Sequence, residues 1–335
     1  MGAVEFYAVT LGIFFCIDAI QALGFNLQFG VAGIINLAYI LLVSVGAYAT
    51  AVATVPPAPK GGFETYIGGL QLGFPWNLLF GVAVTAVFGC LLGVTALRRL
   101  RHDYLALALV ALAQGGQIFA SSDIHFLDGV TGMTNVTGPF ASLSESNFDL
   151  AFLALSFGVL VVVYFIMGRL TGSPFGRALR AVRDDEIGVS ALGKNTWKLR
   201  FAAFVIGAAL AGLGGGLTVL YTGGWNPYAW LPTESAILLA AIVVGGRGRN
   251  AGAVLGALVI MVGATQASTY LPQIGTAQLL PALQTMIVGI VVLVFLWWRP
   301  QGILPERKEK FRPAQSPPVH KVEDKPVASV RADPA

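Results

Sequence analysis

Long apolar runs that are almost free of charge most constrain what this chain can fold into. A helix needs about 20 apolar residues to cross the hydrocarbon core of a membrane, which is about 30 Å thick. Only 11% of the 335 residues are charged, against about 25% in an ordinary soluble domain. The pattern predicts an all-α integral membrane protein, a polytopic helical bundle of about nine spans. The expected spans are residues 4–24, 26–54, 76–97, 104–121, 150–168, 201–221, 234–250, 251–270 and 281–298.

The second run is too long for one straight span. Its 29 residues would extend about 43 Å at about 1.5 Å per residue. Gly30 and Gly33, followed by Asn36, mark the expected break. We therefore predict a broken or re-entrant segment near residues 25–36 and a span at 37–54. Non-helical backbone at that depth has to be buried in protein or line a wet cavity.

The positions of the basic residues predict the orientation. Of the 21 Lys and Arg residues, 20 fall after the third, fifth, seventh and ninth expected spans, and Lys60 is the exception. These four regions lie on one side of the membrane if the nine spans alternate. The positive-inside rule makes that side cytoplasmic. The N-terminus is then outside and the C-terminus is inside.

The residue types that usually carry chemistry are sparse. Cys16 and Cys90 lie inside apolar runs and are expected to be free, buried side chains. The three histidines are never near a cysteine or each other at metal-ligand spacing, so no metal site and no cofactor are expected. The pI of about 9.1 reflects basic loops beside a membrane and does not indicate nucleic-acid binding.

Asp18 is the one acidic residue in the middle of an expected span. Placing an aspartate there costs roughly 3 kcal/mol on insertion scales. Such a residue usually faces the bundle interior and finds a partner, and Gln21, Asn26 and Asn36 are within reach along the sequence. We predict that Asp18 is a structural polar anchor. A proton-carrying or amine-binding role is the alternative.

A dense charged segment, GRALRAVRDDEIGVSALGKNTWK, follows the fifth expected span. Ser173 and Pro174 are typical of a helix start, and Gly193 is typical of a helix end. The run GVSALGKN inside it lacks the Ser or Thr of a phosphate-binding loop and follows three acidic residues. The segment is therefore not expected to bind a nucleotide. A solvated loop and a helix recognised by a partner are both open at this point.

The charged segment and two further blocks resemble one transporter family. The run SPFGRALRAVRDDEIGVSALGKN is similar to the cytoplasmic coupling loop, GRALRAIRExExAAxxxG, of LivH/LivM-type ABC transporter permeases, which import branched-chain amino acids. Residues 24–51 resemble the family's first re-entrant block, and residues 234–260 resemble its late block, VxGGxGxxxGxVxGA. The run LRRLRHDYLALAL at 97–109 favours the LivM-like member.

The resemblance implies a permease subunit that is not itself an enzyme. Its implied partners are a second, LivH-like permease subunit, two ABC ATPase subunits that use ATP and Mg, an extracytoplasmic substrate-binding protein and membrane lipid. It implies a bacterial cytoplasmic (inner) membrane location, with a permease domain at 1–300 and a coupling loop at 169–200. Residues 301–335, rich in proline and in mixed charges, are predicted to be a disordered cytoplasmic tail. The expected ATPase-coupling residues are Gly176, Arg177, Arg180, Arg183, Asp184, Asp185, Glu186, Ala191, Leu192 and Gly193, and the expected translocation-path residues are Asn26, Gly30, Gly33 and Asn36.

The chain departs from the family pattern in two places. Residues 36–40 read NLAYI where LivM-like chains usually carry a Gly-His-Ala-Ala-Phe run, and residues 127–139 match TGGPxGI only loosely. Both places lie near the expected substrate route, so a permease for urea or short amides is an alternative. A stand-alone secondary transporter is a second alternative, although it would call for paired intramembrane charges and internal repeats. A membrane enzyme would need a cluster of catalytic side chains that this sequence lacks.

Overall fold

The computed structural model describes residues 3–57, 66, 68–99, 102–141, 143–266, 279–299 and 301–306. These residues are predominantly helical, and their only β-type pairings are two isolated bridges, Tyr66 with Leu127 and Met133 with Trp225. The all-α prediction is therefore confirmed for this part of the chain. Lys60 and residues 307–335 of the predicted tail lie outside the described residues.

Among the described residues, six helical segments are long and apolar enough to cross a membrane, and three more contain shorter apolar stretches. Each predicted span overlaps one of these segments, residues 267–270 lie outside the described part of the chain, and the count of nine passes stays a prediction. The long ones are α1 (Ala3–Phe25) with η1 (Asn26–Val31), α3 (Trp76–Arg99), α4 (His102–Ser122), α6 (Glu145–Gly172), α9 (Thr196–Thr222), and α10 (Pro232–Gly245) with η2 (Pro227–Ala229). The shorter ones are α2 (Tyr39–Thr54), α11 (Asn250–Gly256) with η3 (Ala257–Gln266), and α13 (Leu279–Trp298). The remaining helices are α5 (Ile124–Leu127), α7 (Pro174–Asp184) and α8 (Glu186–Ala191).

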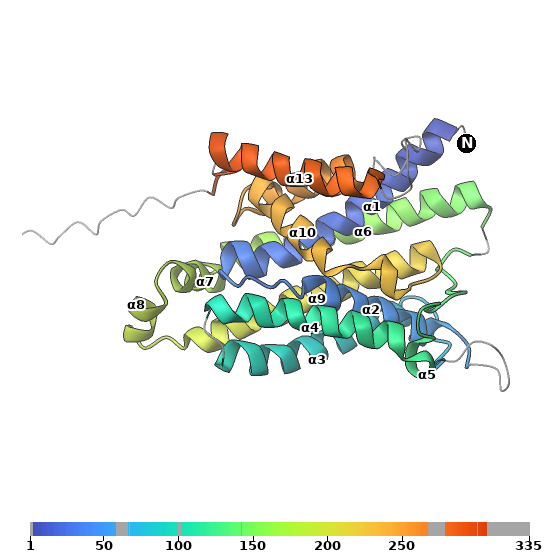
Figure 1. The fold of residues 1–335 in the computed structure, drawn as a ribbon, viewed down its shortest axis with the longest axis horizontal. Coiled ribbons are helices and arrows are strands. Elements are labelled where there is room, and N and C mark those ends of the chain that lie inside the picture. The colour runs from blue at the N-terminus through green and yellow to red at the C-terminus, as the bar shows by residue number, and fades with distance from the viewer. Residues whose placement is uncertain are drawn as a thin grey trace, which may run out of the picture.

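The helices α2, α3 and α9 contact one another extensively, and α1 packs between α6 and α9 (Figure 1). Small residues allow this close approach. A Cβ on Gly46 of α2 would lie 2.4 Å from the Cα of Gly212 in α9, and one on Gly89 of α3 would lie 2.5 Å from the Ala208 Cβ. Van der Waals contact between closely spaced backbones is a main source of helix association in lipid, because no hydrophobic force drives the helices together there.

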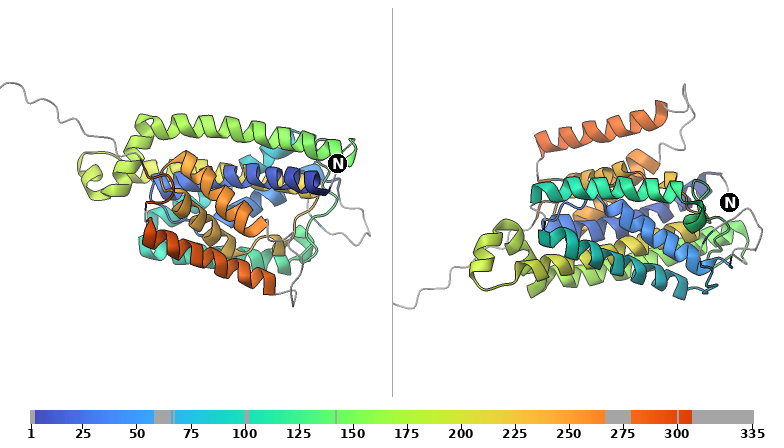
Figure 2. Two further views of the ribbon diagram at one scale, coloured as in Figure 1. Left: turned by 90° about the horizontal axis from the view of Figure 1, so that it is seen from above. Right: turned by 60° about the horizontal axis from the view of Figure 1, so that its bottom comes forward.

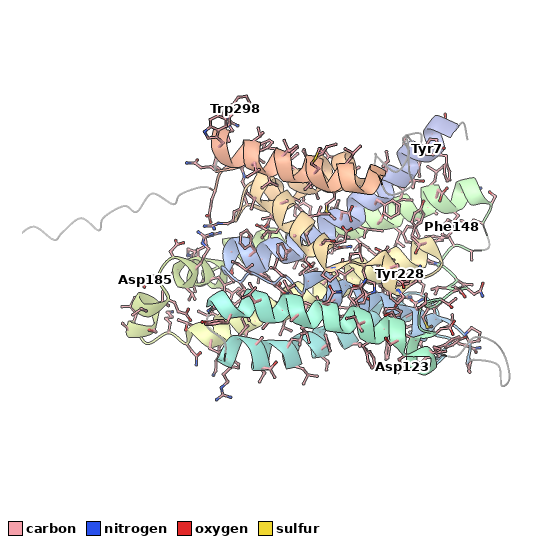
Figure 3. All side chains as sticks on the ribbon, viewed as in Figure 1. Tyr7, Asp123, Phe148, Asp185, Tyr228 and Trp298 are labelled. Atoms are coloured by element: carbon pink, nitrogen blue, oxygen red, sulfur yellow. The ribbon has the colours of Figure 1, made fainter. Side chains whose placement is uncertain are left out.

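The two ends of the bundle differ. The N-terminus lies at one end, and α7 and α8 project from the other (Figures 1 and 2). In Figure 3, Trp298 lies at the same end as Asp185, whereas Tyr7, Phe148 and Asp123 lie at the opposite end. The end of α3 and the start of α4 are also at the α7–α8 end (Figure 1). The end of α3, the helices α7 and α8 and the end of α13 therefore lie at one end, together with the described basic residues of these segments, while Arg101 and residues 307–335 lie outside the described residues.

The break expected at residues 25–36 is shorter than predicted and is not a re-entrant loop. Residues 26–31 continue α1 as a π-helix, so the first half of the predicted break is helical. The wide turns keep the backbone bonded, with Ala32 N–H donating to the Leu27 carbonyl at 3.0 Å. The chain leaves the helix at Gly33, whose φ of 71° suits glycine. It re-enters a helix at Tyr39, close to the predicted residue 37.

The connection between α9 and α10 falls where the sequence places it, between the spans expected at 201–221 and 234–250, but its contacts with α2 were not predicted. The segment 223–231 folds against the middle of α2, where Trp225 Nε1 donates to Ser44 Oγ at 3.3 Å. At the start of α10, Ser235 Oγ accepts from the Ile40 amide at 3.0 Å. The helix α10 also ends at Gly245, and not at residue 250, because Gly246 adopts a φ of 118°.

Candidate coupling site

The charged segment after α6 forms two short helices. Ser173 Oγ accepts from the Gly176 amide, and Pro174 occupies the first turn, so the predicted helix start is confirmed. The helix α7 ends at Asp184, and Asp185 Oδ1 then caps α8 by accepting from the Gly188 amide at 2.9 Å. The predicted single helix up to Gly193 is thus interrupted at Asp185. Gly193 follows α8 with a left-handed φ of 76°.

The tip of this unit presents apolar side chains outward. Ile187 of α8 and Leu192, which directly follows α8, are each 82% exposed, the highest fraction among the large hydrophobic residues from 173 to 193. Large apolar side chains exposed on a charged surface are candidates for contact with another molecule. Most of the predicted coupling residues share this exposure: Arg177, Asp184, Asp185, Ala191, Leu192 and Gly193 are exposed.

The opposite face of α7 packs on the bundle. Leu179 and Val182 are buried, and a Cβ on Gly176 would lie 2.2 Å from the carbonyl oxygen of Thr171. Arg180 Nη2 donates to that same carbonyl at 2.8 Å. Gly176 and Arg180 therefore hold α7 to the end of α6 and do not face outward.

Arg183 is the most connected of the predicted coupling residues. Its guanidinium forms a two-pronged ion pair with Glu306, at 2.9 Å and 3.3 Å, and its Nε lies 3.0 Å from Asp184 Oδ1. Nη1 also donates to the Gly30 carbonyl at the end of η1. Burial alone would lower the pKa of Arg183, but the hydrogen bonds and charges of Glu306 and Asp184 outweigh it and raise that pKa above its usual value. The side chain stays charged and joins α7 to two distant segments.

Three further hydrogen bonds extend this contact into the bundle. Asn26 Oδ1 accepts from the Gly248 amide at 3.0 Å, and Asn26 Nδ2 donates to Asn250 Oδ1 at 3.3 Å. Asn250 Nδ2 donates to Thr171 Oγ1 at 3.3 Å. We call this connected set the polar junction. It comprises Asn26, Gly30, Thr171, Arg180, Arg183, Gly248, Asn250 and Glu306.

The segment after α13 completes the polar junction. The Ile303 and Leu304 amides donate to the Val244 and Gly245 carbonyls at 2.8 Å and 3.0 Å, so the chain lies along the end of α10. The packed part of the molecule thus extends to Glu306, past the predicted domain boundary at residue 300. Glu186, the remaining predicted coupling residue, pairs with Arg200 of α9 at 3.2 Å.

Three of the four predicted path residues lie at or beside the polar junction, and Asn36 bonds elsewhere. Asn26 and Gly30 belong to it, and a Cβ on Gly33 would lie 2.8 Å from Arg183 Cγ. Asn36 is buried and donates to Gln28 Oε1 at 2.9 Å. Two sets of residues that the sequence assigned separately, to coupling and to the path, therefore meet at the contact between Arg183 and Gly30.

Asp18 is 7% exposed, and its Oδ2 has no hydrogen-bond partner among the described residues. Two of its three expected partners make other bonds: Asn26 binds the α10–α11 turn, and Asn36 binds Gln28. The anchor role therefore stays a prediction.

Sequence reasoning missed Thr171, Asn250 and Glu306. Glu306 offered one signal, because it is the first acidic residue after α13 and stands between Arg299 and Arg307. Thr171 and Asn250 offered none, since a lone Thr or Asn near a helix end usually serves local capping. Their contacts depend on the tertiary fold. Among the described residues, no group of three His, Cys, Asp or Glu side chains could hold a metal ion.

Comparison with known proteins identifies the family. Residues 7–296 match the family described as the branched-chain amino acid transport system / permease component. The chain belongs to this family. It is 29% identical to the high-affinity branched-chain amino acid transport system permease protein LivM of Salmonella typhimurium, over 93% of this chain and 72% of LivM. It is 26% identical to a probable LivM of Methanocaldococcus jannaschii, over 92% of this chain and 95% of that protein.

The match to the LivH permease of Salmonella typhimurium is 29% identical but covers 79% of this chain and 85% of LivH. This branched-chain amino acid transport permease is therefore closer to LivM than to LivH, as the sequence blocks indicated. No solved structure matches the chain. The family and the apolar helices together make it a multi-pass membrane protein.

Proposed function

We propose that this chain is the LivM-like permease subunit of an ABC importer. It forms half of a two-permease core, and separate ATPase subunits drive transport by closing on ATP and Mg. The relatives are permease components named for branched-chain amino acid transport, which supports branched-chain or related small amino acids as the substrate. An extracytoplasmic binding protein delivers that substrate.

The observation that carries this proposal is the two-sided construction of α7 and α8. Ile187 and Leu192 face outward at the tip, where an ATPase subunit would cover them, and Arg183 reaches inward to Gly30 at the end of the α1–η1 helix. A displacement of the tip would therefore reach the helix ends through directly bonded groups. A solvated loop would need neither the outward apolar side chains nor the inward ion pair.

We place the α7–α8 end in the cytoplasm and the N-terminus outside. The described basic regions gather at the α7–α8 end, and the positive-inside rule favours the cytoplasm for that end. Nine passes follow if α2, α11 with η3, and α13 cross along with the six long helices. The cytoplasmic (inner) membrane is then the site of action.

We assign Asn26, Gly30, Gly33 and Asn36 to the cytoplasmic gate of the translocation path. They lie where the α1–η1 helix turns back into α2, and Gly30 and Gly33 of this turn are next to Arg183. A turn held by a few polar bonds can adopt two arrangements more readily than a continuous helix, and bistable elements of this kind carry most switching motions.

The test is purification of the tagged chain from native membranes in mild detergent, followed by uptake in proteoliposomes. We expect two ATPase subunits and a second permease to co-purify, and we expect ATP-dependent uptake of labelled leucine that excess valine reduces and excess urea does not. Competition by urea or short amides would instead support the amide permease. Uptake by this chain alone, without ATP, would contradict the ABC assignment and support a secondary transporter.

A further inference from the structure

The segment that follows α13 makes contacts that the proposed coupling role does not require. Residues 301–306 run along the end of α10, and Gly302 is so close to Gly246 that a Cβ on it would lie 2.6 Å from the Gly246 Cα. The segment then places the Glu306 carboxylate between α7 and the α10–α11 turn. A Cβ on Gly248 would lie 2.8 Å from that carboxylate, which shows how closely the turn approaches it.

Glu306 contacts both inward-facing arginines of α7. It accepts two hydrogen bonds from Arg183, and its Oε1 lies 3.4 Å from Arg180 Nε in a charge contact that is not aligned as a hydrogen bond. The Arg183 side chain is 11% exposed and that of Glu306 is 27% exposed. A two-pronged arginine–carboxylate pair in such partly buried surroundings is directional and stronger than an open surface pair.

The same arginine that Glu306 holds also bonds to the Gly30 carbonyl. Three segments far apart in the sequence therefore meet at one guanidinium: the end of η1, the coupling helix α7 and the segment after α13. The Asn26–Gly248 bond ties the α10–α11 turn to the same place.

We propose that residues 301–306 act as a strut that makes α7, the end of η1 and the α10–α11 turn move together, with Glu306 as the positioning residue. The strut fixes where Arg183 lies, and Arg183 in turn holds the turn at Gly30. This inference rests on the proposed function, because it assigns the strut to the step that carries ATPase motion to the gate. The strut thus has a role distinct from that of residues 307–335, the remainder of the tail predicted at 301–335.

Hydrogen exchange on the purified permease chain in detergent tests the strut without any ATPase. Glu306→Gln keeps the shape of the side chain and removes its charge. We expect exchange at the amides of α7 and of residues 30–36 to become about tenfold faster, because hydrogen bonds between charged groups are stronger than those between a charged and a neutral group. Residues 30–36 are the decisive part of this readout, since Glu306 does not contact them.

Two variants control this measurement. Asp184→Asn removes the other carboxylate that contacts Arg183, and because the Asp184 side chain is 66% exposed we expect less than a twofold change in exchange. Glu306→Asp keeps the charge and should restore most of the protection. Unchanged exchange at 30–36 in Glu306→Gln, or equal effects of Asp184→Asn and Glu306→Gln, would overturn the strut.

The functional arm uses the complete transporter and chains that end at Arg307. We expect the shortened chain with Glu306 intact to keep the ATP hydrolysis that the binding protein stimulates. In the same shortened chain with Glu306→Gln, we expect the maximal rate of stimulated hydrolysis to be about tenfold lower, while the amount of bound ATPase is unchanged. Equal stimulation in both shortened chains would refute the strut while leaving the ABC assignment in place. Absence of any ATPase in the wild-type complex would refute the proposed function instead.

Discussion

Arg180 and Arg183, one helical turn apart, show how charged residues of one segment divide between fold and surface. Both face the bundle. Arg180 donates to the Thr171 carbonyl and Arg183 donates to the Gly30 carbonyl, and both arginines form ion pairs with Glu306. Arg177, on the same helix, is exposed. Rim charges mainly steer association and fix register, so Arg177 and its exposed neighbours suit a partner contact. The two inward arginines determine where α7 sits.

Asp18 is the residue whose role a single substitution can decide. Asp18→Asn keeps the shape of the side chain, and Oδ2 has no partner to lose. We expect assembled complex and substrate uptake both to stay within about twofold of wild type, as measured by purified yield and by uptake in proteoliposomes. Normal assembly without uptake would show that the charge itself is needed, as in a proton-carrying or amine-binding role.

Asn26→Leu is the contrast for that experiment. Asn26 is fully buried and makes hydrogen bonds to Gly248 and Asn250, so its replacement leaves two buried polar groups unpaired at about 1–3 kcal/mol each. The yield of assembled complex is expected to fall clearly below that of Asp18→Asn. Equal yields from the two variants would mean that the polar junction contributes little to stability.

At the scale of elements, the local signals in the sequence were sufficient where a helix end is set by its own residues. Ser173 and Pro174 begin α7 as predicted because capping depends on neighbours three residues away. The contacts that the α9–α10 connection and the start of α10 make with α2 were not predicted, because Trp225 and Ser235 bond to residues that are remote in sequence. Glu306 was assigned to a solvated tail for the same reason. Such positions are determined by contacts between segments that are remote in sequence, and local sequence signals do not predict these contacts.

The helix α8 is the element that we expect an ATPase subunit to bind. Gly193 is a poor probe of this contact, because its φ of 76° means that any bulky replacement adds backbone strain of about 1–2 kcal/mol. Ile187→Glu is cleaner, since an 82% exposed side chain contributes little to folding. We expect normal insertion and about tenfold less co-purified ATPase, measured by quantitative immunoblotting, because apolar anchors dominate binding.

Leu143→Glu is the matched control. Leu143 is 44% exposed and precedes α6, whose start lies at the opposite end of the bundle. The same chemical change there should leave ATPase recovery unchanged. Wild-type recovery in Ile187→Glu, or equal losses in both variants, would remove α8 from the ATPase contact.

At the scale of the whole molecule, the number of membrane passes depends on the shorter apolar helices. The end of η1 contacts Arg183 at the α7–α8 end, and α3 finishes at that same end with Arg99. Since α3 and the α1–η1 helix both lead toward that end, α2 has to return the chain to the other end between them. With only 16 residues, it extends about 24 Å, which is short for a core about 30 Å thick. Enclosure by α3 and α9 explains how so short a helix can serve as a pass.

Reporter fusions test this arrangement directly, with alkaline phosphatase active only outside and green fluorescent protein fluorescent only inside. Fusions after Pro57 and Gln266 are expected to report outside, and fusions after Arg99 and Lys194 inside. Pro57 and Arg99 bracket α3 and so decide whether α2 crosses, while Gln266 decides whether α11 with η3 crosses. If α2 did not cross, Pro57 would report inside and Arg99 outside, which would place the basic residues after α3 against the positive-inside rule. An outside signal at Lys194 would invert the whole orientation, and it would also remove α8 from the reach of any ATPase.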